Sequence, residues 1–239
     1  MSTGRSEQVP FDYGHQPSHH EADFIEGQGN RLALLHVRAF PNWPGPLTLL
    51  EGPAKSGKSH LARVWQERAD ALSADPSTLS GFADVDLMRV RPLLIENADR
   101  AGYPEPALFH VLNQSIRDRR PVLITAREPI ANWPFETDDL KSRARLASRF
   151  TMAFSDDIQL TQMFVKLFSD RQVSVDPRVV AFLVARMNRS PEEAVALAEI
   201  ADNLAMSRGT AITRRIAAEA LAQRGVAQGE LDLEGDDDE

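Results

Sequence analysis

The sequence has 239 residues and contains no cysteine, so it holds neither a disulfide framework nor a thiolate metal site. Long apolar runs are also missing, because no stretch approaches the roughly 18 residues that a membrane-spanning helix needs. The first residues lack the apolar core of a signal peptide. These absences exclude the disulfide-rich and membrane-spanning classes, and a cytoplasmic location is the default expectation.

Clustered positive charge is absent as well. The formal net charge is −8, and residues 230–239 carry seven carboxylates and no base, which leaves about −1 on the rest. A nearly neutral body without a basic cluster is not typical of a dedicated duplex-DNA-binding protein. We expect the acidic segment 226–239 to be disordered and the polar segment 1–22 to be a flexible arm.

The sequence does contain a phosphate-binding motif. Residues 52–59 read GPAKSGKS and match G-x-x-x-x-G-K-[ST], between an apolar run at 47–50 and a helical pattern that follows. The glycines let backbone N–H groups turn toward phosphate oxygens, and the helix N-terminus adds a favourable dipole. The lysine would contact the outer phosphates, and the serine hydroxyl would ligate Mg²⁺. The expected nucleotide-binding residues of this loop are Gly52, Pro53, Ala54, Lys55, Ser56, Gly57, Lys58, Ser59 and His60.

Short apolar strands alternate with helical patterns through the first two thirds of the chain. This alternation predicts an α/β fold with a parallel sheet covered by helices on both faces. A helix over 30–40 has its apolar positions at Leu32, Leu35, Val37 and Ala39, and residues 73–91 show little periodicity. The expected strands are 47–50, 92–95, 122–125 and 150–154, and a helix is expected over 138–148.

Beyond residue 156 the strand patterns stop and only helical patterns follow. Asp176-Pro177 provides an N-cap and a first-turn proline, and Ser190 with Glu193 forms a capping box. The expected helices are 157–169, 177–187, 191–207 and 213–224. We therefore expect a nucleotide-binding α/β domain over 23–155 and a small all-α domain over 156–225.

Polar residues at two strand ends complete the expected nucleotide site. Glu96 is the candidate carboxylate on the Mg²⁺ side, because a phosphate-loop enzyme needs an acid at the end of a neighbouring strand. The next position, where many such ATPases have a second acid, is Asn97, and an amide is not a useful base at pH 7. Asp99, two residues further on, either substitutes for that acid or caps the next turn. Thr125 either senses the terminal phosphate or bonds a neighbouring loop.

Three arginines precede the last strand, in the segment SRARLASRF. Arg145 and Arg149 are four residues apart and would share one helix face with an outward direction. An arginine in that place can enter a neighbour's active site and stabilise a transferring phosphate. The alternative is a solvated basic face.

Together these motifs resemble the AAA+ ATPases, and among them the DnaA initiator branch, over about residues 8–224. The segment 24–31 resembles the stretch whose residues contact adenine, which assigns Phe24, Ile25 and Asn30 to the nucleotide. Lys55 replaces a glycine that is common in the family's loop. The segment 146–150 resembles the arginine-finger segment, so Arg149 is the candidate finger and Arg145 a second interface arginine. The helices after 156 resemble the family's lid domain.

Two further features resemble the Hda group of DnaA regulators. We expect no helix-turn-helix domain after the lid, and only about two dozen residues separate the phosphate-loop helix from Glu96. Hda-type proteins also carry an N-terminal peptide that docks into the polymerase sliding clamp. Gln8, Val9, Pro10 and Phe11 have a compressed form of that peptide.

The lid of this family usually offers an arginine to the nucleotide. Arg189 is the nearest candidate here, but Glu192 fits the position equally well, and a carboxylate would favour a diphosphate over a triphosphate.

The resemblance implies a negative regulator of bacterial replication initiation. It would bind ADP or ATP with Mg²⁺, dock on the clamp and stimulate ATP hydrolysis by DnaA through Arg149. Two alternatives stay open: a self-sufficient AAA+ ATPase such as a helicase loader, and a non-catalytic adaptor that binds the clamp. Homo-oligomerisation and the strength of any intrinsic ATPase activity also stay open.

Overall fold

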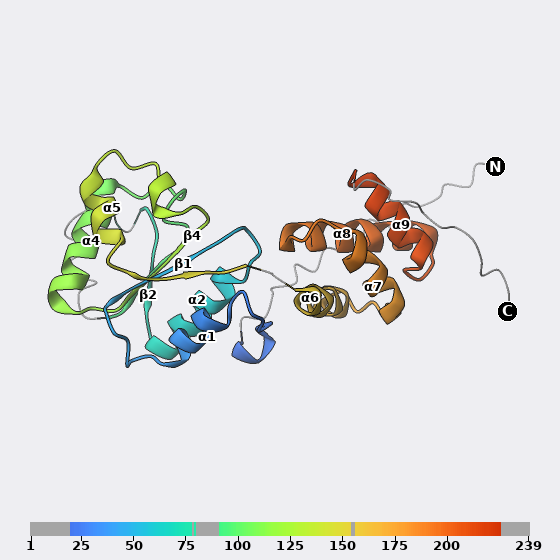
Figure 1. The fold of residues 1–239 in the computed structure, drawn as a ribbon, viewed down its shortest axis with the longest axis horizontal. Coiled ribbons are helices and arrows are strands. Elements are labelled where there is room, and N and C mark those ends of the chain that lie inside the picture. The colour runs from blue at the N-terminus through green and yellow to red at the C-terminus, as the bar shows by residue number, and fades with distance from the viewer. Residues whose placement is uncertain (1–19, 78, 80–90, 154–155, 226–239) are drawn as a thin grey trace, which may run out of the picture.

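The structure is a computed structural model that describes residues 20–77, 79, 91–153 and 156–225. Its described part forms two units, an N-terminal one built on a β-sheet and a C-terminal one built of helices, which lie side by side along the long axis of the molecule (Figure 1). The expected clamp peptide at 8–11 and the acidic tail at 226–239 lie outside the described residues.

The sheet has five parallel strands in the order β2-β3-β4-β1-β5. The strands are β1 (Leu47–Glu51), β2 (Leu72–Ala74), β3 (Leu93–Ile95), β4 (Val122–Ala126) and β5 (Ser148–Thr151). Since β1 lies between β4 and β5, the strand order reverses beside it, and the carboxyl end of β1 opens into the crevice where open α/β sheets bind ligands.

Alternating side chains of the strands fill two cores, one on each face of the sheet. Leu49, Ile95 and Ile124 belong to the core under α4 (Glu105–Asp118) and α5 (Asp138–Ala144). Leu50, Leu94 and Leu123 belong to the core under α1 (Arg31–Arg38) and α2 (Lys58–Ala69). Because both faces are covered, the strands are apolar at consecutive positions, as expected for a parallel sheet.

The C-terminal unit has its own core, built around residues such as Phe164, Leu183 and Leu197. Two predicted helix starts are confirmed: Asp176 Oδ1 accepts from the Arg178 N–H at 2.7 Å, and Ser190 Oγ accepts from the Glu193 N–H at 3.1 Å. The helices are α6 (Asp157–Asp170), α7 (Pro177–Arg186), α8 (Pro191–Arg208) and α9 (Arg214–Gln223).

Several local predictions are wrong. The three-residue strand β2 lies at the edge of a stretch expected to lack periodicity. In α1 the buried face consists of Ala33, Leu34 and Val37, so two of the apolar positions expected to define the helix, Leu32 and Leu35, are exposed. The Glu193 carboxylate does not complete the capping box, because it bonds the Arg224 guanidinium instead.

The N-terminal boundary also differs from the expectation. A 3₁₀ helix, η1 (Glu21–Asp23), overlaps the end of the expected flexible arm, and Glu21 forms ion pairs with Arg38 and Arg68, both at 2.7 Å. These pairs attach the described start of the chain to α1 and α2.

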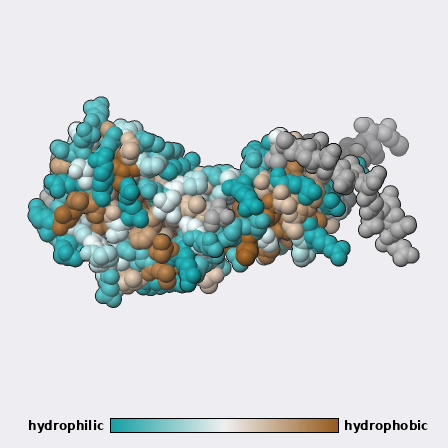
Figure 2. All heavy atoms as spheres, in the orientation of Figure 1, coloured by the Kyte–Doolittle hydropathy of each residue, from teal (hydrophilic) through white to brown (hydrophobic). Residues whose placement is uncertain are grey.

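The visible surface of both units is mainly hydrophilic, with scattered apolar side chains (Figure 2). The described residues include no helix that is both long and apolar enough to cross a membrane. Among the described residues, the large apolar side chains that are exposed are those of Leu32, Leu35, Leu146, Ile158, Val165 and Met206.

Candidate nucleotide-binding site

The phosphate loop connects β1 to α2 and has the backbone that its glycines predict. Gly52 has φ 151°, and a Cβ there would lie 2.1 Å from the Met152 carbonyl oxygen. Gly57 has φ 89° and is the N-cap of α2. Lys55 also has a positive φ, 59°, which explains why glycine suits this position. The loop therefore has the strand–loop–helix geometry of a phosphate site.

Lys58 begins α2 and is folded back over the loop. Its Nζ donates to the carbonyl oxygens of Gly52 at 2.7 Å and Pro53 at 2.5 Å, and to Ser56 Oγ at 3.2 Å. Burial, with a smaller contribution from the positive charge of Arg127, lowers the pKa of Lys58 to about 8. A phosphate would supply the counter-charge that this ammonium group lacks.

The strand-end residues Glu96 and Thr125 already have protein partners. Glu96 Oε2 accepts from Arg63 Nη2 of α2 at 2.5 Å, in a half-buried ion pair. Thr125 Oγ1 accepts from the Asn97 N–H at 2.9 Å, which is the loop contact that the sequence left as the alternative to a phosphate sensor. Asn97 has φ 54°, in a turn that is also held by a bond from the Ala98 N–H to the Thr125 carbonyl.

The donor set does not fit Mg²⁺ in this arrangement. The Glu96 carboxylate bonds the Arg63 guanidinium, which leaves it a weak ligand for the water shell of a divalent cation. The expected metal-binding role of Glu96 thus requires the Arg63 ion pair to break, whereas the expected role of the Ser59 hydroxyl stays a prediction.

Sequence reasoning missed a second cluster beside the loop, centred on Asp99. This buried carboxylate accepts at Oδ2 from Arg100 Nη2 at 2.8 Å and from the N–H groups of Arg127 and Glu128 at 3.2 and 3.1 Å. Burial alone would raise the pKa of Asp99, but these hydrogen bonds more than offset it and hold the pKa below the ordinary value. The signal in the sequence is that Asp99-Arg100 and Arg127 closely follow two strands.

The segment expected to contact adenine lies over the start of α2. Asn30 is buried and organises it: Oδ1 accepts from the Gly27 N–H at 2.9 Å, and Nδ2 donates to the Ile25 carbonyl at 2.8 Å. Phe24 packs edge-on to His60 with ring centroids 5.4 Å apart. The structure thus brings Phe24 and His60 together at the loop, whereas Ile25 packs against the core of the C-terminal unit.

The helical unit approaches this site through α6 and α8. A Cβ on Gly27 would lie 1.9 Å from the Gln159 side chain of α6. Arg189 is exposed and forms an ion pair with Asp157 at 2.9 Å, whereas the negative charge of Glu192 acts on Lys58 and partly opposes the fall of its pKa. Of the two candidates at this position, Glu192 is the one whose charge reaches the phosphate loop.

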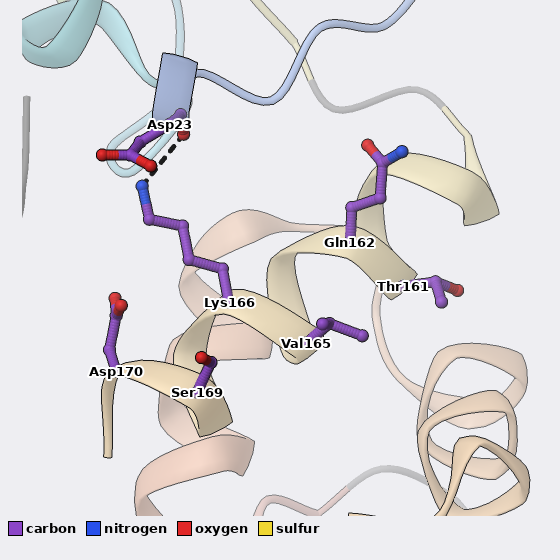
Figure 3. A pocket seen from close by; sticks show the side chains of 7 residues that line it. All are labelled: Asp23, Thr161, Gln162, Val165, Lys166, Ser169 and Asp170. Carbon is purple, nitrogen blue, oxygen red and sulfur yellow. Dashed lines mark hydrogen bonds between the residues drawn. The ribbon is translucent and has the colours of Figure 1, made fainter. Parts of the chain in front are cut away.

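A shallow cavity of about 420 Å³ lies between η1 and α6 (Figure 3). Lys166 crosses it and donates from Nζ to the Asp23 carbonyl at 3.0 Å. None of the expected nucleotide-binding residues lines this cavity.

The interface arginines do not share a helix. The helix α5 ends at Ala144, so Arg145 is its C-cap and Arg149 lies in the edge strand β5, opposite Leu49 of β1. The expectation of a common helix face is therefore wrong. Both arginines are exposed, Leu146 between them is 62% exposed, and neither guanidinium has a hydrogen bond or ion pair within the described part of the chain.

Comparisons with known proteins found no matching protein-family model and no matching curated protein. Solved structures do match. Domain III of the replication initiation protein DnaA from Thermotoga maritima has a TM-score of 0.70 at 17% identity, over 87% of this chain and 97% of that one.

Two other solved structures match with similar TM-scores and identities. AMPPCP-bound DnaA from Aquifex aeolicus gives a TM-score of 0.65 at 16% identity, over 89% of this chain and 70% of that one. The Holliday junction branch migration motor RuvB from Thermotoga maritima gives a TM-score of 0.66 at 17% identity, over 86% of this chain and 72% of that one. These neighbours are AAA+ ATPases, and the chain therefore has the AAA+ P-loop fold, with a five-stranded parallel sheet covered by helices.

Proposed function

We propose that the chain is an Hda-like regulator of replication initiation, which holds an adenine nucleotide and stimulates ATP hydrolysis by DnaA. The nucleotide, ADP or ATP, would bind to the phosphate loop 52–59, with Phe24 and His60 on the base side. The AMPPCP bound to Aquifex aeolicus DnaA supports an adenine nucleotide here. The helices after 156 would act as the lid over this nucleotide.

The observation that carries the proposal is that Arg145 and Arg149, at the edge of the sheet, are exposed and have no side-chain partner among the described residues. In the complex, Arg149 would enter DnaA's site, where water attacks the γ-phosphorus and the bond to the bridging oxygen breaks. The guanidinium stabilises charge on the transferring phosphoryl group, and the products are ADP and phosphate. An arginine supplied in trans is worth ~10³–10⁵ in rate.

The chain's own site supports binding rather than hydrolysis. Asn97 replaces the acid that would activate water, and Glu96 is held by Arg63. A neutral amide cannot take a proton from water at pH 7. The bound nucleotide would then be structural, fixing the sheet unit against the helical unit.

We further propose that Gln8–Phe11 docks into the sliding clamp, so that the regulator acts where replication has begun. The apolar Val9 and Phe11 flanking Pro10 suit an apolar groove.

The test is a pair of rates measured on the purified chain. We expect it to accelerate hydrolysis of DnaA-bound ATP in the presence of DNA-loaded clamp, while its own steady-state turnover stays well below the ~1 s⁻¹ of a typical enzyme. Turnover at enzyme rates without DnaA would favour the self-sufficient ATPase. Clamp binding without any effect on DnaA-bound ATP would favour the adaptor.

A further inference from the structure

The position at which a P-loop protein presents its metal-side carboxylate is occupied by an ion pair in this chain. Glu96 Oε2 lies 2.5 Å from Arg63 Nη2, and the Glu96 side chain is only 17% exposed. Arg63 belongs to α2, the helix that starts in the phosphate loop, so the pair links two elements of the nucleotide site. A carboxylate that already bonds a guanidinium in a half-buried place is a weak ligand for the water shell of a divalent cation.

Positive charge reaches the same place from two other strand ends. Arg100 lies beyond β3 and Arg127 directly follows β4, whose last residue, Ala126, accepts at its carbonyl from the Gly52 N–H at 3.3 Å. Buried Asp99 fixes both, because its Oδ2 accepts from the Arg100 guanidinium and from the Arg127 main chain. The charges of Arg127 and Arg100 both act on Lys58 and help to lower its pKa.

The Arg127 side chain is available for a ligand. It is exposed, and its guanidinium makes no hydrogen bond or ion pair with the residues that the structure describes. The buried Asp99 carboxylate holds the main chain that carries this side chain. The backbone therefore loses little conformational entropy when the side chain binds a ligand. A guanidinium donates two parallel bonds to a phosphate and carries a permanent charge.

We propose that Arg127, assisted by Arg100, neutralises the outer phosphate of the bound nucleotide in place of a divalent cation, so that nucleotide binding is independent of Mg²⁺. The proposal rests on the proposed nucleotide site and specifies its chemistry: three cations, Lys58, Arg100 and Arg127, face one polyphosphate. Asp99 acts as a positioning residue for two of them.

The experiment measures the Kd of the nucleotide-free, full-length chain for ADP by titration calorimetry, in excess Mg²⁺ and in EDTA. The wild-type Kd should change by less than about threefold between the two buffers. Arg127→Gln should weaken binding about tenfold in both buffers, the loss expected for a hydrogen bond between charged groups. The matched control is Arg119→Gln, an exposed arginine without a described side-chain partner, near the amino end of the same strand; its Kd should stay within about twofold.

A second variant tests whether the Glu96–Arg63 ion pair is the reason that Mg²⁺ does not contribute to binding. Arg63→Gln releases Glu96, so Mg²⁺ should tighten ADP binding by this variant and not by the wild type. A wild-type Kd that rises tenfold or more in EDTA overturns the inference while leaving nucleotide binding intact. Equal affinities of Arg127→Gln and the wild type in EDTA also overturn it. No ADP binding in either buffer would instead reject the proposed nucleotide site, and the inference with it.

Discussion

Asp99 offers the sharpest test of how the nucleotide site is held together. It is buried, its Oδ2 accepts from one guanidinium and two backbone N–H groups, and its Oδ1 has no hydrogen-bond partner among the described residues. Asp99→Asn keeps the shape of the side chain but removes the charge. The amide nitrogen of the variant has no described acceptor at the Oδ1 position.

The expected loss of stability follows from the three hydrogen bonds that the Asp99 carboxylate accepts. Hydrogen bonds to charged groups contribute about 1.5–3 kcal/mol and neutral ones about 0.5–1.5 kcal/mol, so three bonds lose about 3 kcal/mol when the charge is removed. Relief of carboxylate burial offsets part of this loss. The lowered pKa of Asp99 shows that the ionised form is favoured on balance. We expect Asp99→Asn to reduce the free energy of unfolding by about 2 kcal/mol.

The assay is urea unfolding of the wild type and variant at pH 7 and at lower pH, with Asp118→Asn as the control. Asp118 is exposed, and its ion pair with the neighbouring Arg117 is screened by solvent, so loss of its charge should cost less than about 1 kcal/mol. The pKa of Asp99 is lower in the folded chain than in the unfolded chain. Its contribution to the free energy of unfolding is therefore present above the unfolded pKa of about 3.9, and it is lost as the pH falls through the folded pKa. Equal stability of Asp99→Asn and the wild type at pH 7 would refute this reasoning.

Two further predictions concern the loop and the core. Gly52→Ala places a Cβ 2.1 Å from the Met152 carbonyl oxygen at φ 151°, so we expect the free energy of unfolding in urea to fall by about 2–4 kcal/mol. Gly45→Ala, whose Cβ would have no atom within 4 Å, should leave it nearly unchanged. An equal loss in both variants would contradict the loop geometry. Burial lowers the pKa of His36 from 6.5 to about 4, so between these pH values His36 is protonated in the unfolded chain but neutral in the folded chain. Stability should therefore fall as the pH drops from 6.5 to 4, and His36→Gln should flatten this dependence; an unchanged slope would show that other groups cause it.

The sequence predicts most of the architecture because its signals are local and strong. The strands at Leu47–Glu51 and Val122–Ala126 are short, mainly apolar segments, and Asp176 and Ser190 are caps with the expected hydrogen bonds. The phosphate loop is specified by glycines whose positive φ few other residues tolerate. These features depend on residues within a few positions of one another, which a single sequence displays directly.

The remaining features depend on contacts between distant segments. The helical pattern over 138–148 continues past Ala144, but pairing with β1 draws Ser148–Thr151 into the sheet and moves Arg149 from a helix to a strand. The strand Leu72–Ala74 exists because it pairs with β3, not because three residues carry a pattern. Likewise, Arg63 reaches Glu96 and Asp99 reaches Arg127 only after the chain has folded.

The central claim is that this chain holds a nucleotide in its own site and acts on another through Arg149. The most direct measurement is the single-turnover rate of ATP hydrolysis on DnaA, with clamp and DNA, in the presence of the wild type or Arg149→Ala. Arg178→Ala, which removes an exposed arginine of α7 in the C-terminal unit, is the control. The account predicts that Arg149→Ala binds ADP normally but no longer accelerates hydrolysis, while Arg178→Ala acts like the wild type. Full acceleration by Arg149→Ala would contradict it.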